Sequence, residues 1–146
     1  MSIVSHLING ELVESQRTLD VTNPSTGKVV RQVADASAAD VERAIAAAQA
    51  AFPAWRDTPP AKRAQVMYRF KQLLEEHAER LVQLVSEEHG KTVEDAMGEL
   101  KRGIENVEYA CGVPELLKGE YSHNVGPGID AWSNFQPLGV VAGITP

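Results

Sequence analysis

The last stretch of the chain, Pro137-Leu-Gly-Val-Val-Ala-Gly-Ile-Thr-Pro146, decides the expected fold class. Its centre, from Val140 to Ile144, is a short apolar run that is followed by a Thr-Pro pair. Such a run is typical of a strand that is buried on both faces of a parallel sheet. In nucleotide-binding α/β sheets the ligand lies just beyond the carboxyl ends of such strands. We therefore expect an α/β protein whose binding site begins where this chain ends, so that the chain is the front part of a larger enzyme.

The composition fits one folded domain and argues against several classes of function. The chain has 146 residues, of which 43% are hydrophobic and 23% charged, as is ordinary for a globular protein. The formal net charge of -6 argues against binding to nucleic acid. No apolar stretch approaches the roughly 18 residues of a transmembrane helix. The N-terminus resembles no secretory signal, and one cysteine cannot form an internal disulfide, so we expect a cytoplasmic protein or a mature organellar one.

Residues 1–36 are expected to form strands. Asn9-Gly10 lies between two apolar stretches and accepts the positive φ angles of a tight hairpin turn. The segment Asn23-Pro-Ser-Thr-Gly27 is a turn by composition. It should connect strands at 19–22 and 28–33.

Residues 37–112 are expected to form helices that pack through their apolar faces. Ser37 with Asp40 has the spacing of a capping box, and Thr92 with Asp95 should begin a later helix in the same way. Apolar residues at helical intervals follow Ser37, which predicts one apolar face on the first helix.

Proline and glycine should divide this helical region. Pro53 is expected to end or kink the first helix near Phe52. Thr58-Pro-Pro60 should open a second helix, since proline is tolerated in a first turn. Gly90 is a plausible terminator of the third helix.

The end of the chain is expected to return to strand. Residues 119–128 look like a polar, glycine-containing connection, and 129–135 alternates as a strand would. The region 119–136 is therefore expected to contain one strand. Residues 137–146 are expected to form a final buried strand and the start of a loop.

Few residues suggest chemistry by themselves. Cys111, the single thiol, lies on an apolar helical face near acidic residues, which favours a structural role. The histidines at 6, 77, 89 and 123 show no metal-ligand spacing and are interpreted as solvated surface side chains. The charged patch Glu87-Glu-His-Gly-Lys91 is interpreted as a solvated face beside a glycine cap. We therefore expect no metal site and no catalytic residue in this chain.

Motifs along nearly the whole chain resemble the N-terminal part of the aldehyde dehydrogenase superfamily. These motifs are Leu7-Ile-Asn-Gly-Glu-Leu12, Asn23-Pro-Ser-Thr-Gly-Lys28, Ala48-Gln-Ala-Ala-Phe-Pro-Ala-Trp55, Glu88-His-Gly-Lys91, Gly98-Glu-Leu100 and Pro137-Leu-Gly-Val140. The chain is more closely similar to the CoA-acylating methylmalonate-semialdehyde dehydrogenases. That likeness rests on Val107-Glu-Tyr-Ala-Cys111, Gly128-Ile-Asp130 and the segment 136–146.

The resemblance implies an activity. Family members oxidise malonate or methylmalonate semialdehyde with NAD, carry the acyl group as a cysteine thioester and transfer it to CoA. The family's catalytic cysteine motif lies further downstream, and Cys111 does not match it. The implied role of this chain is that of a fragment of an NAD-dependent, CoA-acylating dehydrogenase, inactive alone.

The resemblance also implies binding residues and an assembly. Ile144, Thr145 and Pro146 match a family loop that touches NAD largely through its backbone. Residues 137–146 correspond to the first strand and loop of the NAD-binding sheet. Residues 119–136 resemble a region used in oligomerisation, so a homo-oligomer is expected. Phe135 stands where the family frequently has arginine, which leaves any arginine-dependent contact in doubt.

Two other interpretations of the chain stay open. It can be a non-catalytic module that acts through oligomerisation or interaction, or a nonfunctional product of a frameshift or premature stop. The coding sequence after Pro146 separates these interpretations, since an asparagine-containing loop and a cysteine motif there would favour the enzyme or the interrupted gene.

Overall fold

The N-terminal strands form two small β structures. In the computed structural model, which describes residues 2–145, β1 (Ile3–Val4), β4 (Thr18–Asn23) and β5 (Lys28–Ala34) form one sheet of order β1-β5-β4. β1 runs parallel to β5, and β4 runs antiparallel to it. β2 (His6–Ile8) and β3 (Glu11–Val13) form a separate antiparallel hairpin. At its turn Asn9 has φ 53° and Gly10 has φ 80°, which confirms the hairpin expected from Asn-Gly.

Four long or medium helices follow, as the sequence predicted, with one short helix after them. They are α1 (Ala38–Asp57), α2 (Pro60–Glu76), α3 (Ala78–His89), α4 (Val93–Cys111) and the one-turn α5 (Val113–Leu116). Ser37 and Asp40 form the expected capping box, and the Thr92 side chain accepts a hydrogen bond from the amide of Asp95. Gly90 caps α3 in the left-handed conformation, with φ 72°.

Pro53 does not end the first helix. α1 continues through it to Asp57, so of the two outcomes expected near Phe52, an end or a kink, the end is wrong. A proline removes one N–H donor from a helix, and no residue of α1 is buried, so water can hydrate the carbonyl that loses its partner. Thr58 then closes the helix, because its hydroxyl donates to the carbonyl of Ala54 at 2.7 Å.

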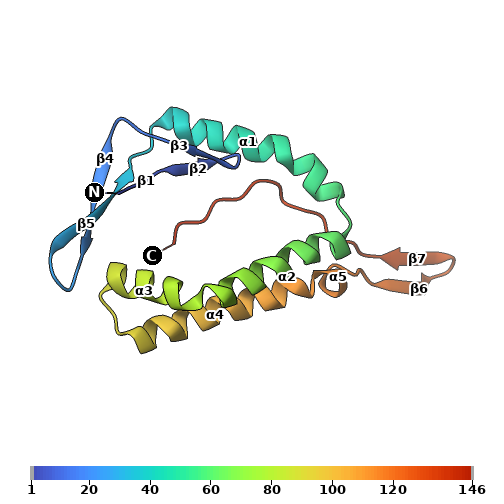
Figure 1. The fold of residues 1–146 in the computed structure, drawn as a ribbon. Helices are drawn as coiled ribbons and strands as arrows, with labels where there is room; N and C mark the ends of the chain where they lie inside the picture. The colour runs from blue at the N-terminus through green and yellow to red at the C-terminus, as the bar shows by residue number, and fades with distance from the viewer. Residues whose placement is uncertain (1, 146) are drawn as a thin grey trace.

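The packed core of the molecule is small and lies mainly among α2, α3 and α4. Its buried side chains are Ala34, Ala64, Val82, Ala96 and Cys111. α1 lies apart from this helical layer (Figure 1) and makes its contacts with β2. The expectation that all the helices pack on one another is therefore wrong for α1, whose apolar residues Val41, Ile45 and Trp55 are 50%, 45% and 46% exposed.

The N-terminal sheet meets the helical layer at one junction, where α3 ends. The Arg31 side chain on β5 forms ion pairs with Glu87 and Glu88 on α3. A Cβ atom on Gly90 would lie 2.9 Å from both Pro24 Cγ and Ser25 Oγ, so only glycine leaves room for the turn between β4 and β5. The junction thereby sets how the two parts of the molecule stand relative to each other.

A second hairpin projects from the end of the helical layer (Figure 1). β6 (Tyr121–Gly126) pairs antiparallel with β7 (Ile129–Trp132). The sequence interpretation of 119–128 as a connection is therefore wrong, and the strand expected at 129–135 is shorter. Side-chain bonds rather than an apolar pattern support β6, since Asp130 accepts from the Tyr121 hydroxyl at 2.5 Å and from the Asn124 amide at 2.8 Å.

The terminal apolar run forms no strand in this structure. Residues 133–145 have no regular secondary structure, and in the view of Figure 1 they run back between α1 and the helical layer. Leu138, Val141 and Ile144 are 96%, 75% and 102% exposed. A buried strand needs strands on both sides, and none among residues 2–145 pairs with this segment. Its place as the first strand of an NAD-binding sheet stays a prediction.

Candidate functional site

Cys111 is a packing residue at the end of α4. Its side chain is buried, with 5% of the residue exposed, and its Sγ donates to the carbonyl of Val107 on the same helix at 3.4 Å. A reactive thiol needs an accessible, electropositive setting. The geometry here agrees with the structural role expected from the sequence.

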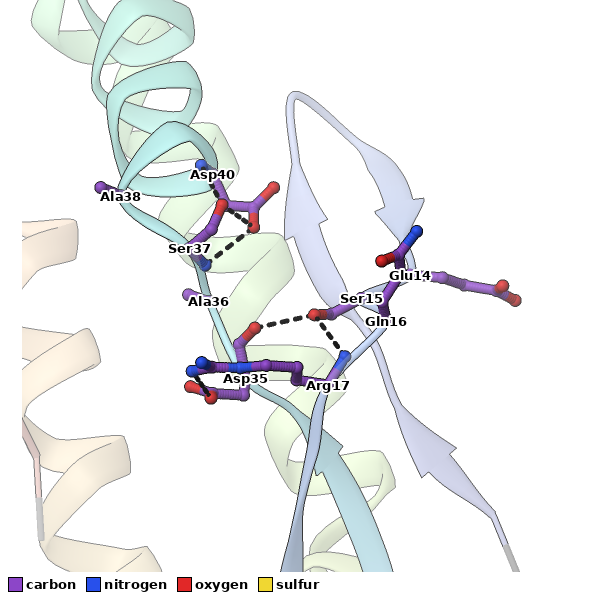
Figure 2. A pocket seen from close by; sticks show the side chains of 9 residues that line it. All are labelled: Glu14, Ser15, Gln16, Arg17, Asp35, Ala36, Ser37, Ala38 and Asp40. Carbon is purple, nitrogen blue, oxygen red and sulfur yellow. Dashed lines mark hydrogen bonds and ion pairs between the residues drawn. The ribbon is translucent and has the colours of Figure 1, made fainter.

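A polar pocket opens where β3 turns into β4 and β5 leads into α1 (Figure 2). Its volume is about 590 Å³. The lining residues are Glu14, Ser15, Gln16, Arg17, Asp35, Ala36, Ser37, Ala38 and Asp40. The Ser15 hydroxyl donates to the carbonyl of Asp35 at 2.8 Å and accepts from the Arg17 amide at 3.2 Å.

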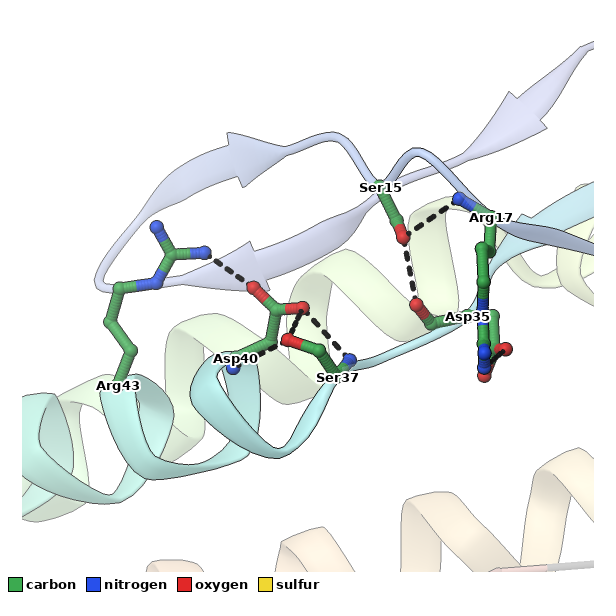
Figure 3. A network of polar contacts seen from close by, with 6 residues as sticks. All are labelled: Ser15, Arg17, Asp35, Ser37, Asp40 and Arg43. Carbon is green, nitrogen blue, oxygen red and sulfur yellow. Dashed lines mark hydrogen bonds and ion pairs between the residues drawn. The ribbon is translucent and has the colours of Figure 1, made fainter.

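Two pairs of charged side chains in and beside this pocket contact each other (Figure 3). Arg17 forms an ion pair with Asp35, and Arg43 donates to Asp40 at 2.7 Å. The Ser37 hydroxyl and amide both donate to Asp40 Oδ2, at 2.7 and 2.9 Å. Hydrogen bonds from Ser37 are the main cause of the lowered pKa of Asp40, and Arg43 adds to it. The network holds the turn into α1, and its cations are already engaged.

The contacts of the charged patch at the end of α3 were missed by the sequence interpretation. Of the residues in this patch, only Gly90 has the role expected from the sequence, which is to end α3. Glu87 and Glu88 contact Arg31, and Lys91 Nζ lies 2.5 Å from Glu99 Oε2. The sequence feature that points to these contacts is Arg31, a charged residue in the apolar run of β5. Its side chain is only 18% exposed, and a cation that is largely removed from water requires an acceptor.

The proposed cofactor residues do not form a crevice by themselves. Ile144 and Thr145 are exposed and lie in the segment without strand pairing. Pro146 lies outside the described residues. NAD binds in these folds between adjacent strands and a helix N-terminus. Residues 137–145 have no regular secondary structure and no paired strand, so by themselves they do not fit the cofactor.

The described residues bring together no group of three or more histidine, cysteine, aspartate and glutamate side chains that could hold a metal ion. His6 departs from the solvated surface role expected for it. It is half-buried, and its Nε2 is buried without a hydrogen-bond partner within the described chain. No helix among these residues is long and apolar enough to cross a membrane.

Comparison with known proteins supplies the class. The model of the aldehyde dehydrogenase family matches residues 12–146. The chain belongs to the aldehyde dehydrogenase family, and its mixed α/β structure matches the N-terminal portion of the solved family structures.

Three relatives show which members the chain is similar to. It is 68% identical to the malonate-semialdehyde dehydrogenase of Pseudomonas aeruginosa, over 100% of this chain and 30% of that protein. A methylmalonate-semialdehyde dehydrogenase structure from Oceanimonas doudoroffii is 63% identical, with TM-score 0.89, over 94% of this chain and 28% of that one. A Sinorhizobium meliloti structure described as the same enzyme, complexed with NAD, is 44% identical, with TM-score 0.93, over 100% of this chain and 30% of that one. The chain thus spans about 30% of these relatives' length.

Proposed function

We propose that this chain is the N-terminal portion of an NAD-dependent, CoA-acylating dehydrogenase of malonate or methylmalonate semialdehyde. The observation that carries the proposal is the 68% identity to a malonate-semialdehyde dehydrogenase along the full chain. The NAD bound in the Sinorhizobium meliloti structure supports the choice of cofactor. CoA as co-substrate and a cytoplasmic location rest on the sequence resemblance and composition.

The contribution of this chain to that activity is positional. Arg31 joins the N-terminal sheet to α3, and the hydrogen bonds between Ser37 and Asp40 hold the start of α1. Among residues 2–145, α2, α3 and α4 form a packed layer of helices. Ile144, Thr145 and Pro146 would reach NAD only with the rest of a nucleotide-binding sheet beside them. The acyl-carrying cysteine is not Cys111, whose thiol is buried.

The β6–β7 hairpin is the region we assign to contact between copies of the enzyme. Tyr121, Ile129 and Trp132 are 64%, 57% and 70% exposed. Each strand of the hairpin pairs with only the other among residues 2–145, so both outer edges offer free backbone groups to another strand. The same exposure favours the second candidate function, a non-catalytic oligomerisation module.

A chimera tests the proposed function directly. Residues 1–146 of this chain replace the aligned segment of the Pseudomonas aeruginosa relative, and NADH formation is measured with malonate or methylmalonate semialdehyde, with and without CoA. We expect CoA-dependent turnover within about tenfold of the parent enzyme, equivalent to ~1.4 kcal/mol of transition-state free energy. Cys111→Ser in the chimera should leave that rate in place.

The contradicting result is equally specific. A chimera that folds and assembles like its parent, yet oxidises neither semialdehyde, would remove the proposed activity and favour the oligomerisation module. Turnover that disappears on Cys111→Ser would contradict the structural role given to this thiol.

A further inference from the structure

A second polar pocket lies at the junction between the N-terminal sheet and the helical layer. It opens between α3 and the turn that joins β4 to β5, which come close together there (Figure 1). The turn contributes Asn23 and Ser25, and one face of α3 contributes Arg80, Gln83 and Glu87. The volume of this pocket, here called the junction pocket, is about 620 Å³. Its walls therefore come from contacts made within residues 23–91.

The hydrogen-bond acceptors of the junction pocket are largely engaged. Asn23 Oδ1 accepts from the Ser25 amide at 2.9 Å. The Glu87 carboxylate forms an ion pair with Arg31, which lies outside the pocket lining. The negative charge of this pocket wall is thus already met by a cation, and a cationic ligand would have to compete with Arg31 for it.

The donors of the same pocket are free. Among residues 2–145, the Arg80 guanidinium, the Gln83 amide group and the Ser25 hydroxyl form no hydrogen bond or ion pair with another side chain or with the backbone. Because Asn23 Oδ1 is held by a backbone amide, its Nδ2 is left as a further donor. Free donors that include a guanidinium fork, beside acceptors that are already engaged, favour an oxyanion as the ligand.

The size of the pocket favours an oxyanion that is attached to an organic group. Its volume lies within the range of about 300–1,000 Å³ that is usual for small-molecule sites. Leu84 supplies an apolar wall beside the polar groups. Lys91 also lines the pocket, but its Nζ lies 2.5 Å from Glu99 Oε2, so Arg80 is left as the charged anchor. A phosphate monoester offers three terminal oxygens to donors that come from two elements.

We propose that the junction pocket binds the phosphate group of a small phosphate monoester. Arg80 holds the charge of the phosphate, Ser25 and Asn23 donate to it from the turn, and Gln83 donates to it from α3. A bound phosphate would bridge the N-terminal sheet and the helical layer. The site is separate from the candidate cofactor residues and does not depend on the proposed function.

An NMR titration of the 146-residue chain tests this inference. The probes are ribose 5-phosphate, inorganic phosphate and, as the uncharged control, ribose. We expect ribose 5-phosphate to shift the amide signals of residues 23–26 and 80–87 along a saturable curve, and ribose to leave them in place. Inorganic phosphate should shift the same signals with weaker affinity. Equal affinity for the two phosphates would overturn the assignment to an ester.

A matched pair of arginine variants separates the site from general attraction to positive charge. Arg69 is exposed on α2, donates to Gln72 and does not line the pocket. We expect Arg80→Ala to weaken ribose 5-phosphate binding by at least about tenfold, and Arg69→Ala to change it by less than about twofold. Ser25→Ala removes a neutral donor at constant charge and should weaken binding by about threefold. The circular dichroism of all three variants should match that of the parent chain.

The chimera with the Pseudomonas aeruginosa relative shows whether the pocket serves in a complete subunit. Isothermal titration of ribose 5-phosphate should detect binding to the chimera that Arg80→Ala weakens. Three results would overturn the proposal: equal effects of the two arginine variants, no saturable shift at residues 23–26 and 80–87, or a chimera whose binding is the same with and without Arg80→Ala.

Discussion

At the scale of single residues, Arg31 decides how the N-terminal sheet joins the helices. Arg31 is a residue of β5, a strand that is otherwise mostly apolar, and its guanidinium contacts two glutamates on α3. Arg31 and Glu87 are 56 positions apart in the sequence, so no local pattern could predict that they are partners. The sequence could indicate only that a half-buried arginine needs acceptors.

Arg31→Ala should loosen this junction. The substitution removes the ion pairs and leaves Glu87 and Glu88 as neighbouring like charges. Because the carboxylates are partly exposed, we expect a loss of about 1–2 kcal/mol in the free energy of unfolding. Urea unfolding followed by circular dichroism measures it, with Lys28→Ala on the same strand as the control. Equal stability of the two variants would show that the junction does not depend on Arg31.

Asp40 gives the start of α1 a defined pH dependence. Hydrogen bonds from Ser37 lower the pKa of its carboxyl group below the ordinary aspartate value. The resulting stabilisation is fully present above that ordinary value and is lost as the pH falls through the lowered folded-state value. We expect the amides of the first turn of α1 to shift in this acidic range in NMR spectra. Asp40→Asn should abolish the transition, and an unchanged transition in that variant would assign it to another group.

At the scale of elements, local signals predicted most of the fold. The Asn9-Gly10 turn, the Ser37 and Thr92 caps and the Gly90 terminator depend on residues within a few positions of each other, so the sequence carries them. β6 escaped prediction because its strand is polar and depends on bonds from Asp130 on the other strand. The sequence left open whether Pro53 ends or kinks α1, because the cost of a proline depends on its exposure, which the sequence does not state.

The base of the β6–β7 hairpin depends on a glycine. A Cβ atom at Gly119 would lie 1.8 Å from the Ser133 carbonyl oxygen, a backbone atom. Gly119→Ala should therefore open the hairpin base and break the bond from the Ser133 amide to the Glu120 carbonyl, now 2.9 Å. Faster hydrogen exchange at Ser133 and altered fluorescence of Trp132 would report this change.

Gly98→Ala is the matched control. Gly98 lies inside α4, where an added Cβ meets nothing within 4 Å. The same substitution should stabilise the helix by roughly 0.5–1 kcal/mol, because alanine loses less conformational entropy than glycine. If Gly119→Ala proves as harmless as Gly98→Ala, the close approach at the hairpin base is not a constraint.

At the scale of the whole molecule, the described residues form an open arrangement with a small packed core. Among residues 2–145 only five are buried, and no strand there pairs with the final apolar run, so this run, expected to be buried, lies in solvent. The candidate cofactor residues could be named from the sequence, but the site could not be built, because a nucleotide crevice needs adjacent parallel strands. None pairs with residues 137–145.

The chain alone should therefore bind NAD weakly or not at all. Ile144 and Thr145 are exposed on a segment without neighbouring strands, so the backbone contacts they would make are not held in place. Isothermal titration of NAD into the purified chain should give no measurable heat of binding. Micromolar affinity would reveal a nucleotide site elsewhere among these residues.

The most direct test of the whole account is the rate of NADH formation by the 146-residue chain supplied with NAD, CoA and malonate or methylmalonate semialdehyde. The chimera with the Pseudomonas aeruginosa relative serves as the positive control. If this chain supports the fold of the enzyme but holds none of its catalytic residues, the chain alone gives no NADH above background while the chimera turns over. Turnover by the chain alone that is lost in Cys111→Ser would contradict the account, since it would make a buried thiol the nucleophile.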